Sequence, residues 1–213
     1  MFVRVEIRAE DLAASQRFYA TVLGAVPIAA TERDADGRGI AWRDFAVVQS
    51  DAAHPATRGL HLGFAVPDRA AVDAFWEAGV GAGYRDDGPP GPRPQYVHDY
   101  YGAFLLDPDG NSAEAVHYGE VRAEGAVDHL WIRVADLAAA RDWYAALAPT
   151  AGWRVRDSGG RRAHVERADG DGSFALVADE RPATQHAHVA VAAPDPASAG
   201  VRRDPDGNRV ELV

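Results

Sequence analysis

The chain has 213 residues, enough for one large domain or two domains of about 100 residues each. Its formal net charge of −10, from 32 acidic and 22 basic side chains, argues against nucleic acid or an anionic membrane surface as a partner. Cysteine is absent, which excludes disulfides and thiolate ligands, so a metal site would have to use His, Asp, Glu or water.

The start of the sequence lacks the basic and long apolar regions of a signal peptide, and no run approaches 18 apolar residues. We therefore expect a soluble, cytoplasmic protein whose partner is a small molecule.

The first predicted elements are a strand and a capped helix. Residues 3–8 alternate apolar and charged side chains, the period of a half-buried strand. Asp11 is placed to cap a helix, and Gly24 to end that helix as its C′ glycine. Residues 26–50 can hold three short strands, with the pair Asp36-Gly37 as a hairpin turn.

The next segment repeats this order of strand, helix and strands. Residues 60–66 predict a core strand, and Asp68 is placed to cap a second helix. The proline-rich residues 86–94 are predicted to be irregular. Residues 101–107 and 112–117 read as strands joined by an Asp-Pro-Asp-Gly turn.

The second half of the chain repeats the first. Three blocks recur in the same order: 10–19 as 135–144, 61–68 as 188–195, and 107–111 as 204–208. The offset falls from 127 residues (His61 to His188) to 97 residues (Asp107 to Asp204), so the second copy lacks 30 residues. The loss lies between Asp195 and Asp204.

The second copy predicts a similar set of elements with a shortened end. These are a strand at 127–134, a helix at 137–147 stopped by Pro149, strands near 153–157, 161–167, 173–178 and 186–192, and a last strand at 209–213. The shortened region contains Pro194, Pro196 and Gly200 and is predicted to be a loop rather than a helix. Residues 119–126 are the expected linker.

The spacing of polar residues around these elements resembles that of a known superfamily. The pattern His-x₆-Asp-Leu followed by aromatic residues, then His-x₆-Asp, then Asp-Pro-Asp-Gly-x₃-Glu resembles the vicinal-oxygen-chelate superfamily of glyoxalases, bleomycin-resistance proteins and extradiol dioxygenases. The resemblance implies an α+β fold of tandem βαβββ modules whose curled mixed sheets surround a cleft. It implies a complete domain of two modules at 1–118 and a second domain at 127–213 with a shortened second module.

The resemblance also implies a metal site. The positions that hold metal in this superfamily carry, in the second copy, His129, His188 and Glu211. Because successive side chains of a strand point to opposite faces, each of these three residues faces away from the apolar side of its strand. Two imidazoles and one carboxylate would hold one divalent ion, with Fe²⁺ or Mn²⁺ favoured and Zn²⁺ or Ni²⁺ as alternatives. Residues 173–178 offer no fourth ligand, which disfavours a glyoxalase I activity. The alternative is that the three side chains are inherited and only bond to one another or to water.

In the first copy the corresponding positions carry Arg4, His61 and Glu114. Arg4 would repel a cation and pair with Glu6 or Glu114, so all three positions are expected to line a ligand cleft.

A loop after the proline-rich segment carries the remaining candidates for that cleft, namely Tyr96, His98, Tyr100 and Tyr101. It is either a lid over the cleft, with His98 as a possible general base, or a rigid surface loop packed by its own aromatic residues.

The leading hypothesis is a metal-dependent enzyme, similar to an extradiol dioxygenase or a related lyase or isomerase, acting on a small substrate with two adjacent oxygens. No side chain can be named as the catalytic acid or base. The alternative is a non-catalytic module of the bleomycin-resistance type that binds or sequesters a small molecule in the first-copy cleft. A third hypothesis is that the second copy is mainly a dimerisation or packing element. The missing strands would leave sheet edges exposed, and because such edges need covering we expect a homodimer.

Overall fold

The computed structural model describes residues 2–30, 32–33, 39–119, 126–167 and 173–213. The expected hairpin turn at Asp36-Gly37 and most of the expected linker at 119–126 lie outside the described residues.

The chain forms four modules, three with the order strand, helix and three strands, and a fourth that is shortened. Module 1 contains β1 (Phe2–Ala9), α1 (Leu12–Gly24), β2 (Glu32–Arg33), β3 (Gly39–Trp42) and β4 (Phe45–Gln49). Module 2 contains β5 (His61–Ala65), α2 (Arg69–Gly81), β6 (Arg85–Pro92), β7 (Tyr101–Leu106) and β8 (Ser112–His117). Module 3 contains β9 (Val127–Arg133), α3 (Leu137–Ala151), β10 (Trp153–Asp157), β11 (Arg162–Arg167) and β12 (Ser173–Val177). Module 4 contains β13 (His188–Val191), a 3₁₀ turn (Pro196–Ser198), β14 (Gly200–Arg203) and β15 (Arg209–Leu212).

Each of the two sheets joins one module from each half of the chain. The eight-stranded sheet, with the order β10-β11-β12-β9-β5-β8-β7-β6, combines modules 2 and 3. The seven-stranded sheet, with the order β14-β15-β13-β1-β4-β3-β2, combines modules 1 and 4. The modules meet through antiparallel first strands, β5 with β9 and β1 with β13. The expected pairing of modules within 1–118 and within 127–213 is therefore not the pairing that the structure has.

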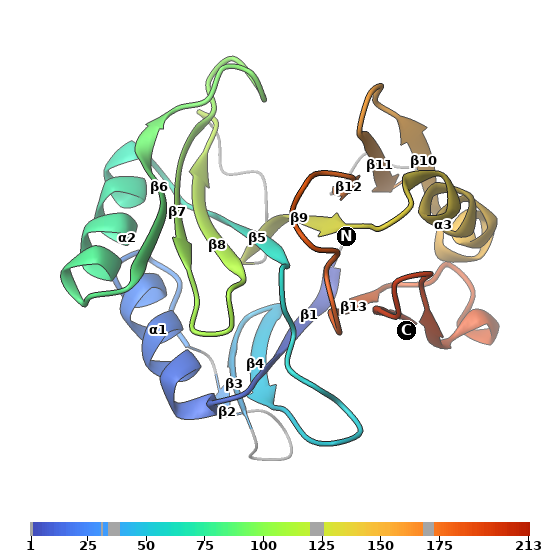
Figure 1. The fold of residues 1–213 in the computed structure, drawn as a ribbon, viewed down its shortest axis with the longest axis horizontal. Coiled ribbons are helices and arrows are strands. Elements are labelled where there is room, and N and C mark those ends of the chain that lie inside the picture. Colours follow the sequence, from blue (N-terminus) through green and yellow to red (C-terminus); the bar gives the residue numbers. More distant parts are fainter. Residues whose placement is uncertain (1, 31, 34–38, 120–125, 168–172) are drawn as a thin grey trace.

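The core lies between the sheets and the helices that cover them. In Figure 1, α1 and α2 lie together on one side of the molecule and α3 on the opposite side, with β1, β5, β9 and β13 between them. The helices contribute fully buried aromatic residues, Phe18, Tyr19, Phe75 and Tyr144. Burying this apolar area is the main stabilising contribution to such a fold. Within the described ranges, none of the helices has the length and apolarity needed to cross a membrane.

The helix starts are as predicted, but two helix ends differ. The side chains of Asp11 and Asp68 cap α1 and α2 by accepting backbone N–H groups three residues on. Gly24 is the last residue of α1 rather than a left-handed C′ residue. In α3 the helix continues through Pro149 to Ala151, and Gly152, with φ 69°, is its left-handed C-cap.

Two segments predicted to be irregular contain strands. Residues 85–92 form β6, at the edge of the eight-stranded sheet, where prolines can be accommodated because one side of the strand needs no partner. Its pairing with β7 shifts register around Gly88, which has φ 155°. In module 4 the predicted loop contains a single 3₁₀ turn and the edge strand β14.

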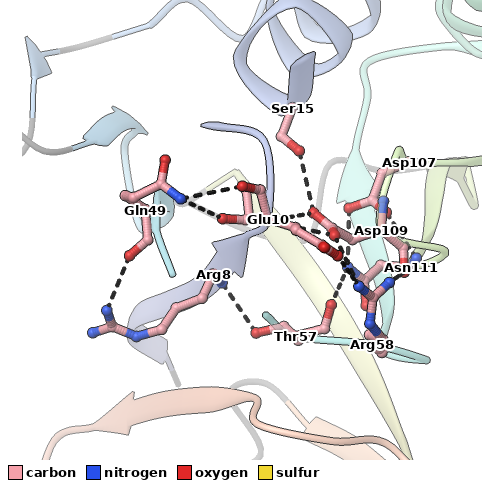
Figure 2. A network of polar contacts seen from close by, with 10 residues as sticks. Arg8, Glu10, Ser15, Gln49, Thr57, Arg58, Asp107, Asp109 and Asn111 are labelled. Carbon is pink, nitrogen blue, oxygen red and sulfur yellow. Dashed lines mark hydrogen bonds and ion pairs between the residues drawn. The ribbon is translucent and has the colours of Figure 1, made fainter. Parts of the chain in front are cut away.

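The Asp-Pro-Asp-Gly turns join the last two strands of modules 2 and 4, and each turn contacts a helix of the preceding module. Asp107 accepts hydrogen bonds from the Tyr19 hydroxyl at 3.0 Å and from the Asn111 backbone at 2.8 Å. Figure 2 shows Asp109 facing Glu10 and Ser15 at the start of α1. Burial raises the pKa of Asp107 to about 6. The turn thus fixes the start of β8 against the first module.

Candidate metal centre

Three side chains of the eight-stranded sheet bring their donor atoms together. Nε2 of His61 lies 2.9 Å from Oε2 of Glu114 and 3.3 Å from Nε2 of His129. Nε2 of His129 lies 3.3 Å from the same Oε2. Ligands at neighbouring positions around an ion, each about 2.1 Å from it, are separated by about 3 Å. The spacing of the three donors therefore fits one shared divalent ion.

The register of three neighbouring strands produces this convergence. Gly63 in β5 faces Glu114 in β8 on one side and His129 in β9 on the other. A Cβ added at Gly63 would lie 2.3 Å from Cε1 of His129, and one at Gly102 would lie 2.4 Å from Oε1 of Glu114. Both distances are too short for a real contact, so the two glycines provide the space that the ligands occupy.

The imidazole rings are oriented by partners on their outer nitrogens. Nδ1 of His129 lies 2.8 Å from Oδ2 of Asp128. Nδ1 of His61 lies 3.2 Å from Oγ of Ser112, whose hydroxyl donates to Asp87 at 2.7 Å. Because the serine proton is directed to Asp87, its oxygen accepts from the His61 ring. With Nδ1 donating outward, a deprotonated Nε2 would direct its lone pair to an ion at the centre of the cluster.

Glu114 is oriented in the same way. The Tyr100 hydroxyl donates to its Oε1 at 2.6 Å, which leaves Oε2 as the atom that faces both imidazoles. Burial works against the charge of Glu114, but the adjacent imidazoles of His129 and His61 lower its pKa to about 2. Burial likewise opposes charge on His129, yet Asp128 and Glu114 raise its pKa to about 9. The cluster thus favours a positive charge beside a fully buried carboxylate.

Aromatic side chains surround the cluster on one side. The Trp131 ring lies 4.7 Å from the His61 ring, and Tyr96 lies 5.4 Å from Trp131. The guanidinium of Arg162 lies over Trp131 at 4.4 Å from the ring centre. Trp131, Ser112, Asp128 and Asp87 were not among the residues selected from the sequence. Trp131 and Ser112 lie two strand residues from a candidate ligand and Asp128 lies next to one, and this is their only sequence signal. Asp87 lies near no candidate ligand in the sequence.

The structure separates the predicted lid residues. Tyr96 and Tyr100 lie at the cluster, as described above. Tyr101 turns away and donates to Asp73 on α2 at 2.9 Å. The side chain of His98 is 93% exposed and pairs with Asp99, so no contact supports its expected role as a general base.

The predicted grouping of His129 with His188 and Glu211 is not the one in the structure, which places His129 with the first-copy residues His61 and Glu114. His188 and Glu211 belong to the seven-stranded sheet, where Nε2 of His188 lies 2.8 Å from Oε2 of Glu211. The reason is the pairing of modules across the two halves of the chain.

Arg4 is also in the seven-stranded sheet and does not line the same site as His61 and Glu114. Its guanidinium pairs with Glu6 at 3.0 Å, one of the two partners expected from the sequence.

The position for a fourth ligand carries alanine. On β8, Glu114 pairs with Gly63, which lies two residues after His61. On β12, the equivalent residue pairs with Trp131, which lies two residues after His129, and this residue is Ala175. The strand expected to lack a fourth ligand thus has Ala175 at the position that such a ligand would occupy. Among the described residues, the donor set of the cluster is two imidazoles and one carboxylate.

Paired βαβββ modules with a His/Glu/His cluster between two first strands define a protein of the glyoxalase-like fold. Residues 2–115 match the family model described as Glyoxalase/Bleomycin resistance protein/Dioxygenase superfamily, and the chain belongs to this superfamily. No curated protein matches the chain.

Solved structures agree with the fold. Glyoxalase I from Zea mays is similar over 100% of this chain and 91% of its own, with TM-score 0.65 and 18% identity. A mutant of that enzyme gives TM-score 0.66 and 20% identity over the same shares. A glyoxalase/bleomycin resistance protein from Albidiferax ferrireducens is 34% identical, covering 55% of this chain and 98% of its own, with TM-score 0.49.

Proposed function

We propose that the chain is a divalent-metal-dependent enzyme in which His61, Glu114 and His129 hold one ion. The observation that carries this proposal is the convergence of three donor atoms at 2.9 to 3.3 Å, each backed by a partner on its far side. A donor set of two imidazoles and one carboxylate suits Fe²⁺ or Mn²⁺, with Zn²⁺ or Ni²⁺ as alternatives.

The reaction we propose is of the extradiol-dioxygenase type or that of a related lyase or isomerase, on a small substrate with two adjacent oxygens. The ion, when bound, would supply Lewis-acid stabilisation of negative charge on those oxygens. Ala175 offers no donor, so a set of three protein ligands leaves more room for substrate than the four-ligand set of a glyoxalase I. This difference favours the proposed reaction class.

The chain's own side chains would orient the substrate and keep the ligands in place. Asp128 holds the proton on Nδ1 of His129, and Tyr100 holds one oxygen of Glu114. The flat faces of Trp131 and Tyr96 offer an apolar wall against which a planar substrate would stack.

Metal analysis of two matched variants tests this proposal. Protein purified without chelator is expected to hold about one equivalent of metal per chain. His61→Ala should lose the metal, whereas His188→Ala, at the equivalent position of the other sheet, should keep it. Equal metal content in both variants would contradict the proposal. Stabilisation of the protein by organic ligands alone, with no response to Fe²⁺, Mn²⁺ or Zn²⁺, would favour the non-catalytic binding module instead.

The homodimer expected from the open sheet edges stays a proposal. The outer strands β6, β10, β2 and β14 are the free edges within the sheets as described. Light scattering at micromolar concentration measures the state directly, and a mass of one chain would exclude the dimer.

A further inference from the structure

In the seven-stranded sheet, the position equivalent to His61 carries His188, which lies beside two arginines. Across β1, β13, β15 and β14, neighbouring strands align Glu6, His188, Arg209 and Arg203. The same row of the eight-stranded sheet consists of Trp131, His61, Ser112 and Leu106. Two arginines thus replace a serine and a leucine beside the histidine that both sheets share.

A small cavity lies at this row. Its volume is about 120 Å³, and its polar lining consists of three arginines and three histidines: Arg8, Arg203, Arg209, His54, His186 and His188. No acidic side chain of the described residues lines it. Drug-sized ligands occupy cavities of about 300–1,000 Å³. The cavity therefore has room for a small anion or for one charged group of a larger molecule.

Two of the arginines have no acidic partner among the described residues, although the guanidinium of Arg203 donates to the Gly207 carbonyl oxygen at 3.0 Å. Glu6 pairs with Arg8 at 2.9 Å, whereas no carboxylate of the described part of the chain lies within 4.0 Å of the guanidinium groups of Arg203 or Arg209. The whole chain has a net charge of −10, so carboxylates are abundant elsewhere. Guanidinium groups present several donors in a plane that matches the oxygens of a carboxylate or phosphate.

His188 has an unused polar atom beside these arginines. Its Nδ1 is buried without a hydrogen-bond partner and lies 3.6 Å from the nearest oxygen of Glu6. In the other sheet Ser112 satisfies the equivalent atom of His61, but Arg209 stands at the serine position here. The arrangement that orients a metal-binding imidazole is thus absent, and a ring nitrogen is left for another partner.

The backbone of His186 is also unusual. His186 has φ 59°, and its counterpart in the first copy, Gly59, has φ 70°. A left-handed conformation is free of strain for glycine but costs energy for a residue with a side chain. The Thr57 hydroxyl holds His186 there by donating to its carbonyl oxygen at 2.9 Å. The second copy therefore keeps a strained residue whose imidazole lines the cavity, a feature typical of ligand sites.

We propose that this cavity is an anion site, in which Arg203, Arg209, His186 and His188 bind a phosphoryl or carboxylate group of a small molecule. The site is separate from the metal centre and does not depend on bound metal. The guanidinium groups of Arg203 and Arg209 would supply the main ionic contacts, and the His186 imidazole would supply an additional donor. His188, whose Nε2 pairs with Glu211, would form part of the wall of the site.

Anion binding by the metal-free 213-residue chain tests the proposal, with inorganic phosphate and succinate as the two probes. Isothermal titration is expected to give one site per chain for at least one probe, and the preferred probe identifies the phosphoryl or carboxylate chemistry. Arg209→Gln and Arg203→Gln should each weaken that affinity at least tenfold. Arg202→Gln is the matched control, because it removes the same charge from β14 on the opposite face of the strand and should leave the affinity within twofold.

His186→Gly separates a ligand role from a structural one. The variant should melt at the same temperature as the wild type or above it, because it relieves the left-handed strain, while its affinity for the preferred anion falls. Absence of binding by both probes would overturn the proposal, and so would an equal loss in the Arg202→Gln control. Neither result bears on the metal content that tests the proposed function.

Discussion

The eight-stranded and seven-stranded sheets use one scaffold for two different sets of side chains. In the first, Gly63 faces His129 and Glu114, and the three donors converge. In the second, Ala190 occupies the glycine position and faces Arg4 and Glu211. A histidine and a glutamate remain in both sheets, so these two residues are not enough to indicate a metal centre. The difference lies in the third donor, in the space beside it and in the residues that orient the rings.

The largest expected difference between the sheets is the pH dependence of metal binding. Asp128 and Glu114 raise the pKa of His129 to about 9, so a metal ion has to displace a proton below that pH. Affinity should rise about tenfold per pH unit between pH 7 and 9 and then level off. Titration calorimetry in buffers of different ionisation enthalpy should show release of about one proton.

The same pKa predicts the stability of the metal-free protein. Because the folded pKa of His129 lies above its unfolded value of 6.5, its contribution to stability is complete below pH 6.5 and is lost as the pH rises through about 9. The His129→Gln variant should lack this loss between pH 6.5 and 9. An unchanged alkaline profile in denaturant unfolding would argue against a charged His129.

Adding one methyl group to the first sheet should weaken the metal centre without changing a ligand. In Gly63→Ala the new Cβ would meet the His129 ring at 2.3 Å, so the ring must move. We expect metal affinity to fall on the order of 10- to 100-fold, the range seen when a ligand loses its support. The reciprocal variant Ala190→Gly in the second sheet is the control and should leave metal binding unchanged. Full affinity in Gly63→Ala would show that the observed packing is not required.

Loss of one hydroxyl should have a smaller effect. Tyr100→Phe removes the donor to Oε1 of Glu114, and we expect about a tenfold loss of metal affinity with little change in melting temperature. Tyr101→Phe is the matched control, because that hydroxyl donates to Asp73 on α2. Equal effects of the two variants on metal binding would remove Tyr100 from the site.

The smallest expected effect is one that the two copies share. Tyr19 donates to Asp107 at 3.0 Å, and Tyr144 donates to Asp204 at 3.2 Å in the equivalent turn. Replacing either tyrosine with phenylalanine should lower the free energy of unfolding by about 1–2 kcal/mol and leave metal binding unchanged. Denaturant unfolding measures the change. A much larger loss for one variant would show that the two turns do not contribute equally.

Local patterns in the sequence predicted the parts of the fold that depend on neighbouring residues. The caps at Asp11 and Asp68 and the alternating strand at residues 3–8 follow from period and turn chemistry. The end of α3 was misplaced, because the helix runs through Pro149 and ends only before the left-handed Gly152. The prolines of residues 86–94 led to a loop prediction for an edge strand, which tolerates proline because it needs fewer backbone donors.

The candidate site was only partly predictable. Each of the six ligand positions was identified from its motif, but a motif does not say which first strand pairs with which. Whether His129 lies beside His61 or beside His188 depends on which strand pairs with β9. This long-range pairing is not determined by the local periodicity of the sequence. The complete set of two histidines and one glutamate was present in the sequence, distributed over both copies.

The cross-pairing of modules also has a consequence for how the two halves can change. In a symmetric assembly of two identical chains, every substitution appears twice, and both interfaces change together. Once both halves belong to a single polypeptide, Arg4 and His129 can differ although they occupy matching places. Covalent linkage thus frees one interface to acquire new chemistry while the other retains the old.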